Sequence, residues 1–201
     1  MAVIIVLFFF FPATFASIVV NVTTGTSESG WAEDAVAQCE DEVAKGTMVY
    51  PAEKCITLAS DAEATVAGYG GEDVKIVLTP FPMPKASCNS SIGDVQACVT
   101  ENTKTIFVSN FALMSEGGDS TLAHEYVHIL TSDKERAWLA SHADVWAGEV
   151  NVAGNATTPA EGVADCSVSY FTPSINPAYM PEGCSATQME IATALIEDTL
   201  V

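Results

Sequence analysis

The stretch DSTLAHEYVHIL occupies residues 119–130, and the rest of the chain is interpreted around it. On an α-helix, residues four positions apart lie on the same face. His124 and His128 could therefore offer two imidazole nitrogens to one small cation. Glu125 follows the first histidine, so its carboxylate would lie at the edge of that face. From there it could act as a general base on a water molecule beside the cation. The stretch therefore predicts two metal ligands and a base.

The same stretch has the features of a well-defined helix. After two glycines, Asp119 or Ser120 is expected to cap its N-terminus. Its apolar positions form a stripe away from the histidines: Leu122, Ala123, Tyr126, Val127 and Leu130. A coincidental pair of surface histidines is the alternative, but the chain has 3 histidines and two of them fall here. We therefore favour a metal site.

The composition limits the classes of function. The chain has 201 residues, which is the size of one domain with an N-terminal targeting segment. Lys and Arg number 7 against 26 Asp and Glu, and the formal charge is −19. Such a surface would be repelled by a phosphate backbone, so a nucleic-acid partner is excluded. The same negative charge favours a soluble monomer.

The N-terminal segment is apolar. Residues 2–20 carry no charged side chain, and a run of that length can cross a bilayer or serve as a signal peptide. We expect residues 1–20 to be a signal peptide or a membrane anchor, which would be the chain's only contact with a membrane. Residues 21–30 are small and polar and are expected to form a linker, followed by a single domain over 31–201.

The cysteines favour the same destination. There are 6 of them, with no C-x-x-C pair. In an exported chain an even number indicates disulfides, which form in oxidising compartments. Many connectivities are possible, and pairing between neighbours in the sequence gives Cys39 with Cys55, Cys88 with Cys98, and Cys166 with Cys184. The protein is thus expected to be secreted or to face the outside of the cell.

The remaining elements indicate an α+β fold, a small mixed sheet packed on the helix of the histidines. Strands are predicted at residues 73–78 and 104–109, with a disulfide-stapled loop over 79–100 between them. The second strand is expected to form the edge of the cleft, where an extended peptide could add as a further strand. Helices are predicted over 31–45, from Ser132 to about 146, from 158 to 171 and over 186–200, whereas 53–68 is ambiguous.

A catalytic zinc usually has three protein ligands. Glu161 and Asp165 lie four apart on the helix over 158–171 and would share one face. If Glu161 binds the metal, Asp165 can accept a hydrogen bond from the far nitrogen of a liganding histidine. The alternative is that Glu161 only completes a capping box with Thr158, in which case Asp165 could be the ligand. His142 is not at the spacing of a third ligand.

HEYVH at 124–128, together with the E-x-x-A-D pattern from Glu161 to Asp165, resembles the gluzincin metallopeptidases. The thermolysin-like and the bacterial neutral zinc metallopeptidases carry similar strings. The resemblance spans about residues 119–170 and is specific only at the five site positions. It implies a zincin-like fold with further C-terminal helices, with one zinc ion held by His124, His128 and Glu161. It also implies that Glu125 is the general base and Asp165 the partner of a ligand.

We therefore expect an exported zinc metallopeptidase that acts on peptides or proteins. A donor that stabilises the transition state is not identified by the resemblance, and His142 and Tyr170 are candidates, with Tyr126 and Tyr179 behind them. One alternative is a non-catalytic zinc-binding protein with a zincin fold, used outside the cytoplasm for binding or regulation. Another is a membrane-tethered binding module in which the histidine pair holds no metal.

Overall fold

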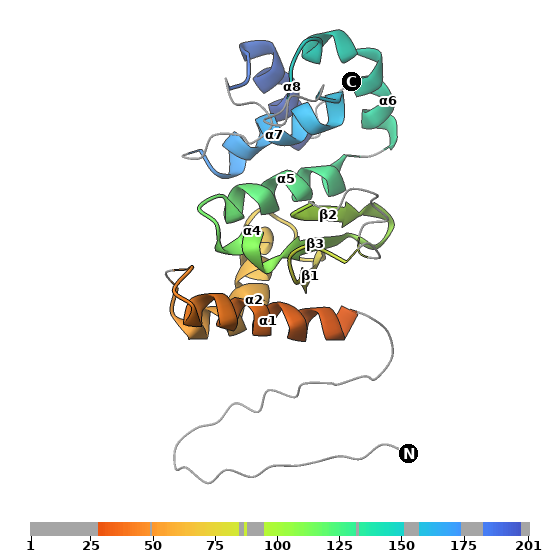
Figure 1. Cartoon of the computed structure of the whole chain (residues 1–201). Helices are drawn as coiled ribbons and strands as arrows, with labels where there is room; N and C mark the ends of the chain where they lie inside the picture. Colours follow the sequence, from red (N-terminus) through yellow and green to blue (C-terminus); the bar gives the residue numbers. More distant parts are fainter. Residues whose placement is uncertain are drawn as a thin grey trace, which may run out of the picture.

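The computed structural model describes residues 28–48, 50–84, 87, 95–131, 133–150, 157–173 and 183–197. These residues form a mixed α+β structure in which a small sheet lies between helices (Figure 1). Residues 1–20, the expected targeting segment, lie outside the described ranges. The first helix begins at Glu28, inside the range 21–30 that was expected to be a linker.

The sheet has three strands in the order β1-β3-β2. β1 (Lys75–Thr79) pairs with β3 (Thr105–Ser109) in parallel, and β2 (Ala97–Thr100) pairs with β3 in antiparallel fashion. The strands predicted at 73–78 and 104–109 are confirmed, as is the mixed character of the sheet. β1 and β3 are built from β-branched and large apolar residues, and nearly all of their positions are buried.

Two sequence-based expectations about the sheet are wrong. The strand at 104–109 is not an edge, because β3 pairs on one side with β1 and on the other with β2. It therefore has no free edge for a peptide. The range 79–100 is not all loop, because its last four residues form β2. The alternation of Val95, Ala97 and Val99 was the available signal for this strand.

Helices cover both faces of the sheet. α1 (Glu28–Ala44) brings Trp31 against Val77 and Phe107 on one face. α2 (Ala52–Gly68) and α5 (Gly118–Leu130) pack on the other face, where their apolar residues meet alternate residues of β1 and β3. The ambiguous range 53–68 is thus a helix. The short helix α4 (Asn110–Met114), which was not predicted, connects β3 to α5 and is capped by Ser109.

The C-terminal helices lie on the side of α5 away from the sheet (Figure 1). α6 (Asp133–Ser141), the 3-10 turn η2 (Ala143–Trp146), α7 (Pro159–Phe171) and α8 (Ala186–Ile196) share an apolar core with Val127 of α5. The helix predicted from Ser132 to 146 is interrupted at His142, and the last helix ends before 200. α5 is therefore a shared wall between the sheet and these helices.

No described helix is long and apolar enough to cross a membrane.

Candidate metal centre

α5 carries His124, Glu125 and His128, as the sequence predicted for a helix here. It begins at Gly118, and its N-terminal cap is Gly117 rather than Asp119 or Ser120. The Ser120 and Thr121 hydroxyls instead donate hydrogen bonds to the Gly117 carbonyl, at 2.7 and 3.1 Å. The apolar stripe is buried, except that Leu130 at the end of the helix is 36% exposed. Packing on both sides of α5 thus fixes the rotation of the helix about its own axis.

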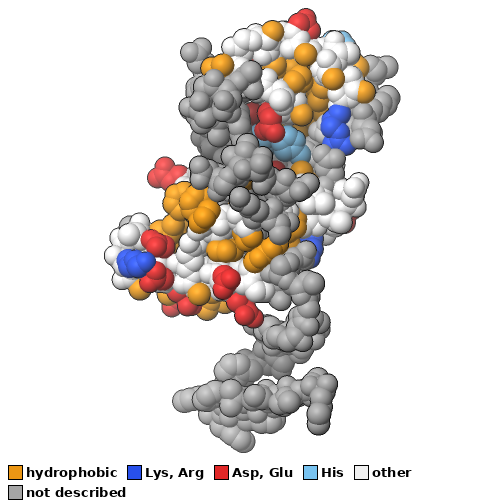
Figure 2. Space-filling model, turned by 45° about the vertical axis from the view of Figure 1, so that its right-hand side comes forward, with side chains coloured by type: hydrophobic (Ala, Val, Ile, Leu, Met, Phe, Trp, Pro, Cys, Tyr) orange, Lys and Arg blue, Asp and Glu red, His pale blue; other side chains and the backbone are white. Residues whose placement is uncertain are grey.

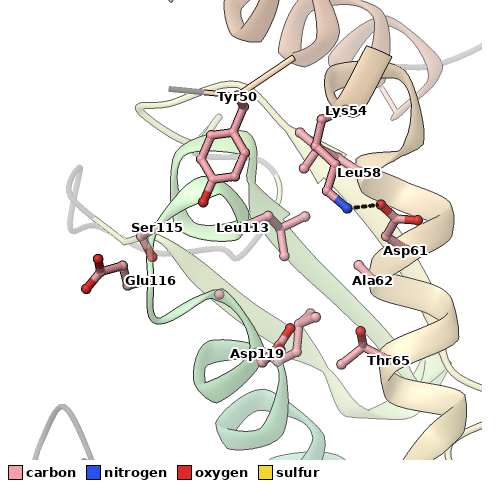
Figure 3. A pocket seen from close by; sticks show the side chains of 12 residues that line it. Tyr50, Lys54, Leu58, Asp61, Ala62, Thr65, Leu113, Ser115, Glu116 and Asp119 are labelled. Atoms are coloured by element: carbon pink, nitrogen blue, oxygen red, sulfur yellow. Dashed lines mark hydrogen bonds and ion pairs between the residues drawn. The ribbon is translucent and has the colours of Figure 1, made fainter. Parts of the chain in front are cut away.

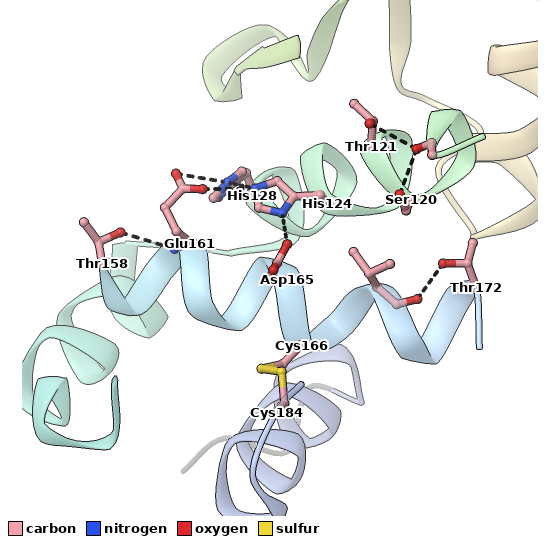
Figure 4. Close-up of polar contacts among 12 residues, drawn as sticks. Ser120, Thr121, His124, His128, Thr158, Glu161, Asp165, Cys166, Thr172 and Cys184 are labelled. Carbon is pink, nitrogen blue, oxygen red and sulfur yellow. Dashed lines mark hydrogen bonds and ion pairs between the residues drawn. A yellow bond between two sulfur atoms is a disulfide. The ribbon is translucent and has the colours of Figure 1, made fainter. Parts of the chain in front are cut away.

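α7 supplies the two carboxylates. Thr158 caps the helix, and its hydroxyl accepts a hydrogen bond from the Glu161 main-chain nitrogen at 3.3 Å. Pro159 follows at the first helical position, where its missing N–H is not needed. α7 packs along α5, so Glu161 and Asp165, one turn apart, both reach the histidines (Figure 4). The cap and the carboxylate contacts therefore use different atoms of the same residue.

The potential ligand atoms of His124, His128 and Glu161 converge on one point (Figure 4). His124 Nε2 lies 3.2 Å from His128 Nε2 and 3.1 Å from Glu161 Oε2. His128 Nε2 lies 3.6 Å from Glu161 Oε1. Two imidazole nitrogens directed at each other and at a carboxylate form a group that could hold a metal ion.

Asp165 orients the His124 ring through the ring nitrogen that faces away from His128 and Glu161. His124 Nδ1 donates to Asp165 Oδ1 at 3.2 Å, which leaves Nε2 directed at the convergence point. Burial by itself lowers the pKa of His124. The hydrogen bonds to Asp165 and Glu161 and the charge of Glu125 outweigh burial and raise this pKa to about 10. The carboxylates therefore attract positive charge to the place where a cation would sit.

The Glu125 carboxyl group is buried beside this group but is not a member of it. Only 9% of the residue is exposed. Burial raises the pKa of this carboxyl group, while the charges of His124 and His128 lower it and the charge of Glu161 raises it. By contrast, contacts with His124 and His128 outweigh burial and hold the pKa of Glu161 well below its usual range. The pKa values of these two nearby glutamates are thus shifted in opposite directions.

The centre opens toward solvent on the side of Glu161. The exposed fraction of the side chain rises from 2% at Asp165 through 8% at His124 to 37% at Glu161. In the space-filling view, histidine and acidic side chains reach the surface together (Figure 2). A bound cation could therefore exchange ligands with the outside while its histidines stay anchored in the core.

The two residues considered as transition-state donors do not join this group. His142 stacks on Trp138 with ring centroids 3.9 Å apart, and its Nδ1 lies 2.9 Å from the Trp138 carbonyl oxygen. Tyr170 is 50% exposed on α7, nine positions beyond Glu161 and thus about 13 Å along the helix on its opposite side. Tyr126 packs in the core against Tyr69 and Phe171, and Tyr179 lies outside the described residues.

Two described disulfides join neighbouring segments of the chain, and one of them involves a helix of the centre. Cys39 is bonded to Cys55 and Cys166 to Cys184, the pairings expected from proximity in the sequence. Cys166 follows Asp165 directly, so the second bond links α7 to Cys184, just before the N-terminus of α8 (Figure 4). Cys98 is also disulfide-bonded. Its expected partner Cys88 lies outside the described residues. These bonds fit an oxidising compartment.

A hollow away from the centre lies between α2 and the turn that leads into α5 (Figure 3). It measures about 320 Å³ and has an apolar floor that includes Leu58 and Leu122. Lys54 and Asp61 form an ion pair of 2.5 Å at its wall. None of the convergent metal-centre residues lines it, so it is separate from the candidate metal centre.

Comparison of the chain with models of protein families, with curated proteins and with solved structures finds no match. The interpretation of the centre therefore depends on its residues and their geometry.

Proposed function

We propose that this protein is an exported zinc metallopeptidase of the gluzincin type with a zincin-like fold. The observation that carries the proposal is the convergence of His124, His128 and Glu161 on one point, with Glu125 buried beside them. A structural zinc site has all of its positions filled by protein and has no need of an adjacent base. Three ligand groups, a solvent-facing side and a base are the parts of a hydrolytic site.

Zinc is the metal that this set of donors favours. Two imidazoles and a carboxylate are a common zinc set, whereas Mg²⁺ and Ca²⁺ prefer oxygen ligands throughout. Ligands about 2.0–2.1 Å from one zinc ion at tetrahedral angles lie about 3.3–3.4 Å apart. The two histidine nitrogens are 3.2 Å apart and His124 Nε2 lies 3.1 Å from Glu161 Oε2, both close to this value. His128 Nε2 lies 3.6 Å from the other carboxylate oxygen, Glu161 Oε1. Small side-chain adjustments would therefore suffice for binding.

A zinc ion held there would supply a Lewis acid and lower the pKa of a coordinated water toward 7. Glu125 would accept a proton from the attacking water and return it to the leaving amine. Its raised pKa suits this exchange, because a very weakly basic carboxylate would accept a proton poorly. Asp165 would hold the His124 ring in orientation throughout, through the hydrogen bond to Nδ1.

β2 is the strand that could align a peptide substrate. It packs against α5 and, within the described part of the sheet, pairs only with β3. An extended peptide could add to its other edge by main-chain hydrogen bonds. Peptide binding, first expected at the strand over 104–109, is thus proposed for β2, the neighbouring strand.

Metal analysis of the purified protein tests the proposal most directly. The domain produced without residues 1–20 and without a histidine tag should carry about one zinc per chain after purification in the absence of chelators. His124→Ala and His128→Ala should each remove it, whereas His142→Ala, a matched histidine change outside the group, should retain it. Folded wild-type protein free of zinc, and unable to take it up, would refute the metal site.

Peptide hydrolysis separates an enzyme from a binder. A mixed-peptide library incubated with the zinc-loaded domain should show cleavage that chelation abolishes and zinc restores. A zinc-loaded domain that cleaves neither the library nor an unfolded protein would favour the alternative, a non-catalytic zinc protein with the same fold.

A further inference from the structure

Trp146 packs against the first turn of α7 at Gly162, the residue that follows Glu161. It is 2% exposed and is among the largest fully buried side chains of the described residues. Its core includes Val127 of α5 and Val163 of α7, the two helices that carry the candidate ligands. Its Nε1 has no hydrogen-bond partner among the described residues, so packing alone holds the indole in place.

Gly162 is the point of contact. A Cβ atom at this position would overlap Cδ1 and Nε1 of Trp146 and would lie 2.9 Å from Cγ. Gly162 has an ordinary helical conformation, and its nitrogen donates to the Thr158 carbonyl at 2.9 Å. Glycine is less favourable than alanine inside a helix. The absence of a side chain is therefore explained by the close approach of the indole and not by a backbone requirement.

The other side of Trp146 is anchored to α8. Gln188 is 2% exposed, and its Nε2 donates to the Val145 carbonyl at 3.1 Å and to Glu149 Oε1 at 3.3 Å. Its Oε1 accepts from the Ser185 main-chain nitrogen at 2.7 Å, as part of the cap of α8. The buried Gln188 amide thus holds the chain before and after Trp146. A displacement of the indole by a larger side chain on α7 would have to disrupt these hydrogen bonds.

We infer that Trp146 and Gly162 are positioning residues that set how far the Glu161 carboxylate reaches toward the two histidines. The indole of Trp146 limits how closely the first turn of α7 can approach η2, and we call this contact the stop. Because Gly162 has no side chain, the backbone of α7 can pack directly against the indole. A bulkier residue at 162 would displace the turn, and Glu161 with it, by a distance that a metal site does not tolerate. This inference rests on the proposed zinc site, and it concerns packing that touches neither the metal nor a substrate.

The test is a double-mutant cycle read by zinc affinity. Gly162→Ala should weaken zinc binding roughly 10–100-fold, the range seen when the support of a ligand is lost. Trp146→Phe, which shortens the stop, should weaken it by a smaller factor. The double variant should regain an affinity within about threefold of wild type, because the smaller ring leaves room for the new methyl group. Gly68→Ala is the control, since nothing lies within 4 Å of a Cβ at that helical glycine.

A second measurement distinguishes failure of this inference from failure of the zinc proposal. The chain has 3 histidines, so the imidazole ¹⁵N signals of metal-free protein can be assigned individually. Gly162→Ala should move the signals of His124 and His128, which contact Glu161, and leave His142 unchanged, with recovery in the double variant. A wild type that binds no zinc refutes the proposed function, while these signals still decide the positioning role.

Three results would overturn the inference: unchanged zinc affinity and ring signals in Gly162→Ala, a folded double variant with no recovery, or no effect of Trp146→Phe. If Gly162→Ala alone does not fold, the double variant decides. If the double variant folds and shows wild-type ring signals, the positioning role is supported. If the double variant does not fold, the positioning role is refuted.

Discussion

Glu161 is the residue on which two interpretations of the sequence competed. As the third residue of α7 it could have completed a capping box with Thr158. In the structure its nitrogen is bonded to the Thr158 hydroxyl, whereas its carboxylate is directed at His124 and His128. Residues in the first turn of a helix can cap through the main chain and still present a side chain elsewhere. The cap and the ligand role are therefore compatible.

The roles of the two α7 carboxylates can be separated by mutation. Glu161→Ala should lose zinc and activity together, because it removes one of the three convergent groups. Asp165→Ala should reduce zinc affinity or activity by roughly 10–100-fold, since it removes only the support of His124. Glu63→Ala, an exposed acid on α2, serves as the control. Full zinc and activity in Glu161→Ala, with loss of both in Asp165→Ala, would transfer the ligand role to Asp165.

Glu125 can be tested without disturbing the metal. Glu125→Gln keeps the shape of the side chain and should retain zinc, while hydrolysis falls by roughly 10²–10⁴-fold. Burial raises the pKa of Glu125, so its ionised form costs stability at neutral pH. The neutral amide should therefore leave the melting temperature unchanged or higher. Unchanged turnover in a zinc-loaded Gln variant would rule out Glu125 as the base.

At the scale of elements, α5 and α7 form the centre because each is held by further contacts besides those that it makes with the other helix. α5 packs on the sheet through Leu122 and Tyr126 and on the C-terminal helices through Val127. α7 is fixed by its cap at Thr158, by the disulfide at Cys166 and by Trp146. Helices held in this way can bring side chains 37 residues apart, such as His124 and Glu161, within 3.1 Å of each other.

The cap of α7 should therefore influence the metal as well as stability. Thr158→Ala should lower the free energy of unfolding by about 0.5–2 kcal/mol, as is usual for loss of an N-cap. It should also weaken zinc binding, because the hydroxyl holds the nitrogen of Glu161 itself. Ser185→Ala removes the equivalent cap of α8 and should cost similar stability with a smaller effect on zinc. Denaturant unfolding of metal-free protein and chelator competition measure the two quantities.

Equal losses of zinc affinity in the two cap variants would mean that the effect follows from stability in general and not from the position of Glu161.

At the scale of the whole molecule, two disulfides of nearly equal span lie in different parts of the structure. Cys39–Cys55 closes a separation of 16 residues between α1 and α2, and Cys166–Cys184 closes 18 between α7 and the residue before the cap of α8. Chain entropy gives each about 3 kcal/mol of stabilisation. Because only the second is attached to the ligand-bearing helix, their effects on the metal should differ.

Replacing each pair by two alanines tests this difference. Both double variants should lose comparable stability, of about 2–4 kcal/mol, in denaturant unfolding of the metal-free protein. Only Cys166→Ala with Cys184→Ala should also reduce zinc affinity below the wild-type value, measured where both variants are folded. A similar drop in zinc affinity in the α1–α2 variant would show that the centre responds to global stability.

Local chemistry accounts for what could be predicted from sequence. The histidine helix, the start of α7 and the strands β1 and β3 follow from spacing, capping and β-branched composition, which act over a few residues. The same local spacing placed Glu161 and Asp165 on one face. The choice of Cys39 with Cys55 and Cys166 with Cys184 followed from proximity along the chain.

Only the tertiary structure decided features that depend on contacts between distant segments. That β3 is the central strand, with β1 and β2 on either side of it in the described sheet, depends on pairing that no single strand encodes. The approach of Trp146 to Gly162 depends on how α8 anchors η2, and that contact joins residues 16 positions apart on different elements. Local periodicity determines which face of a helix is apolar and packs inward. The distance between that face and its neighbours is set by the volume of the side chains on other elements.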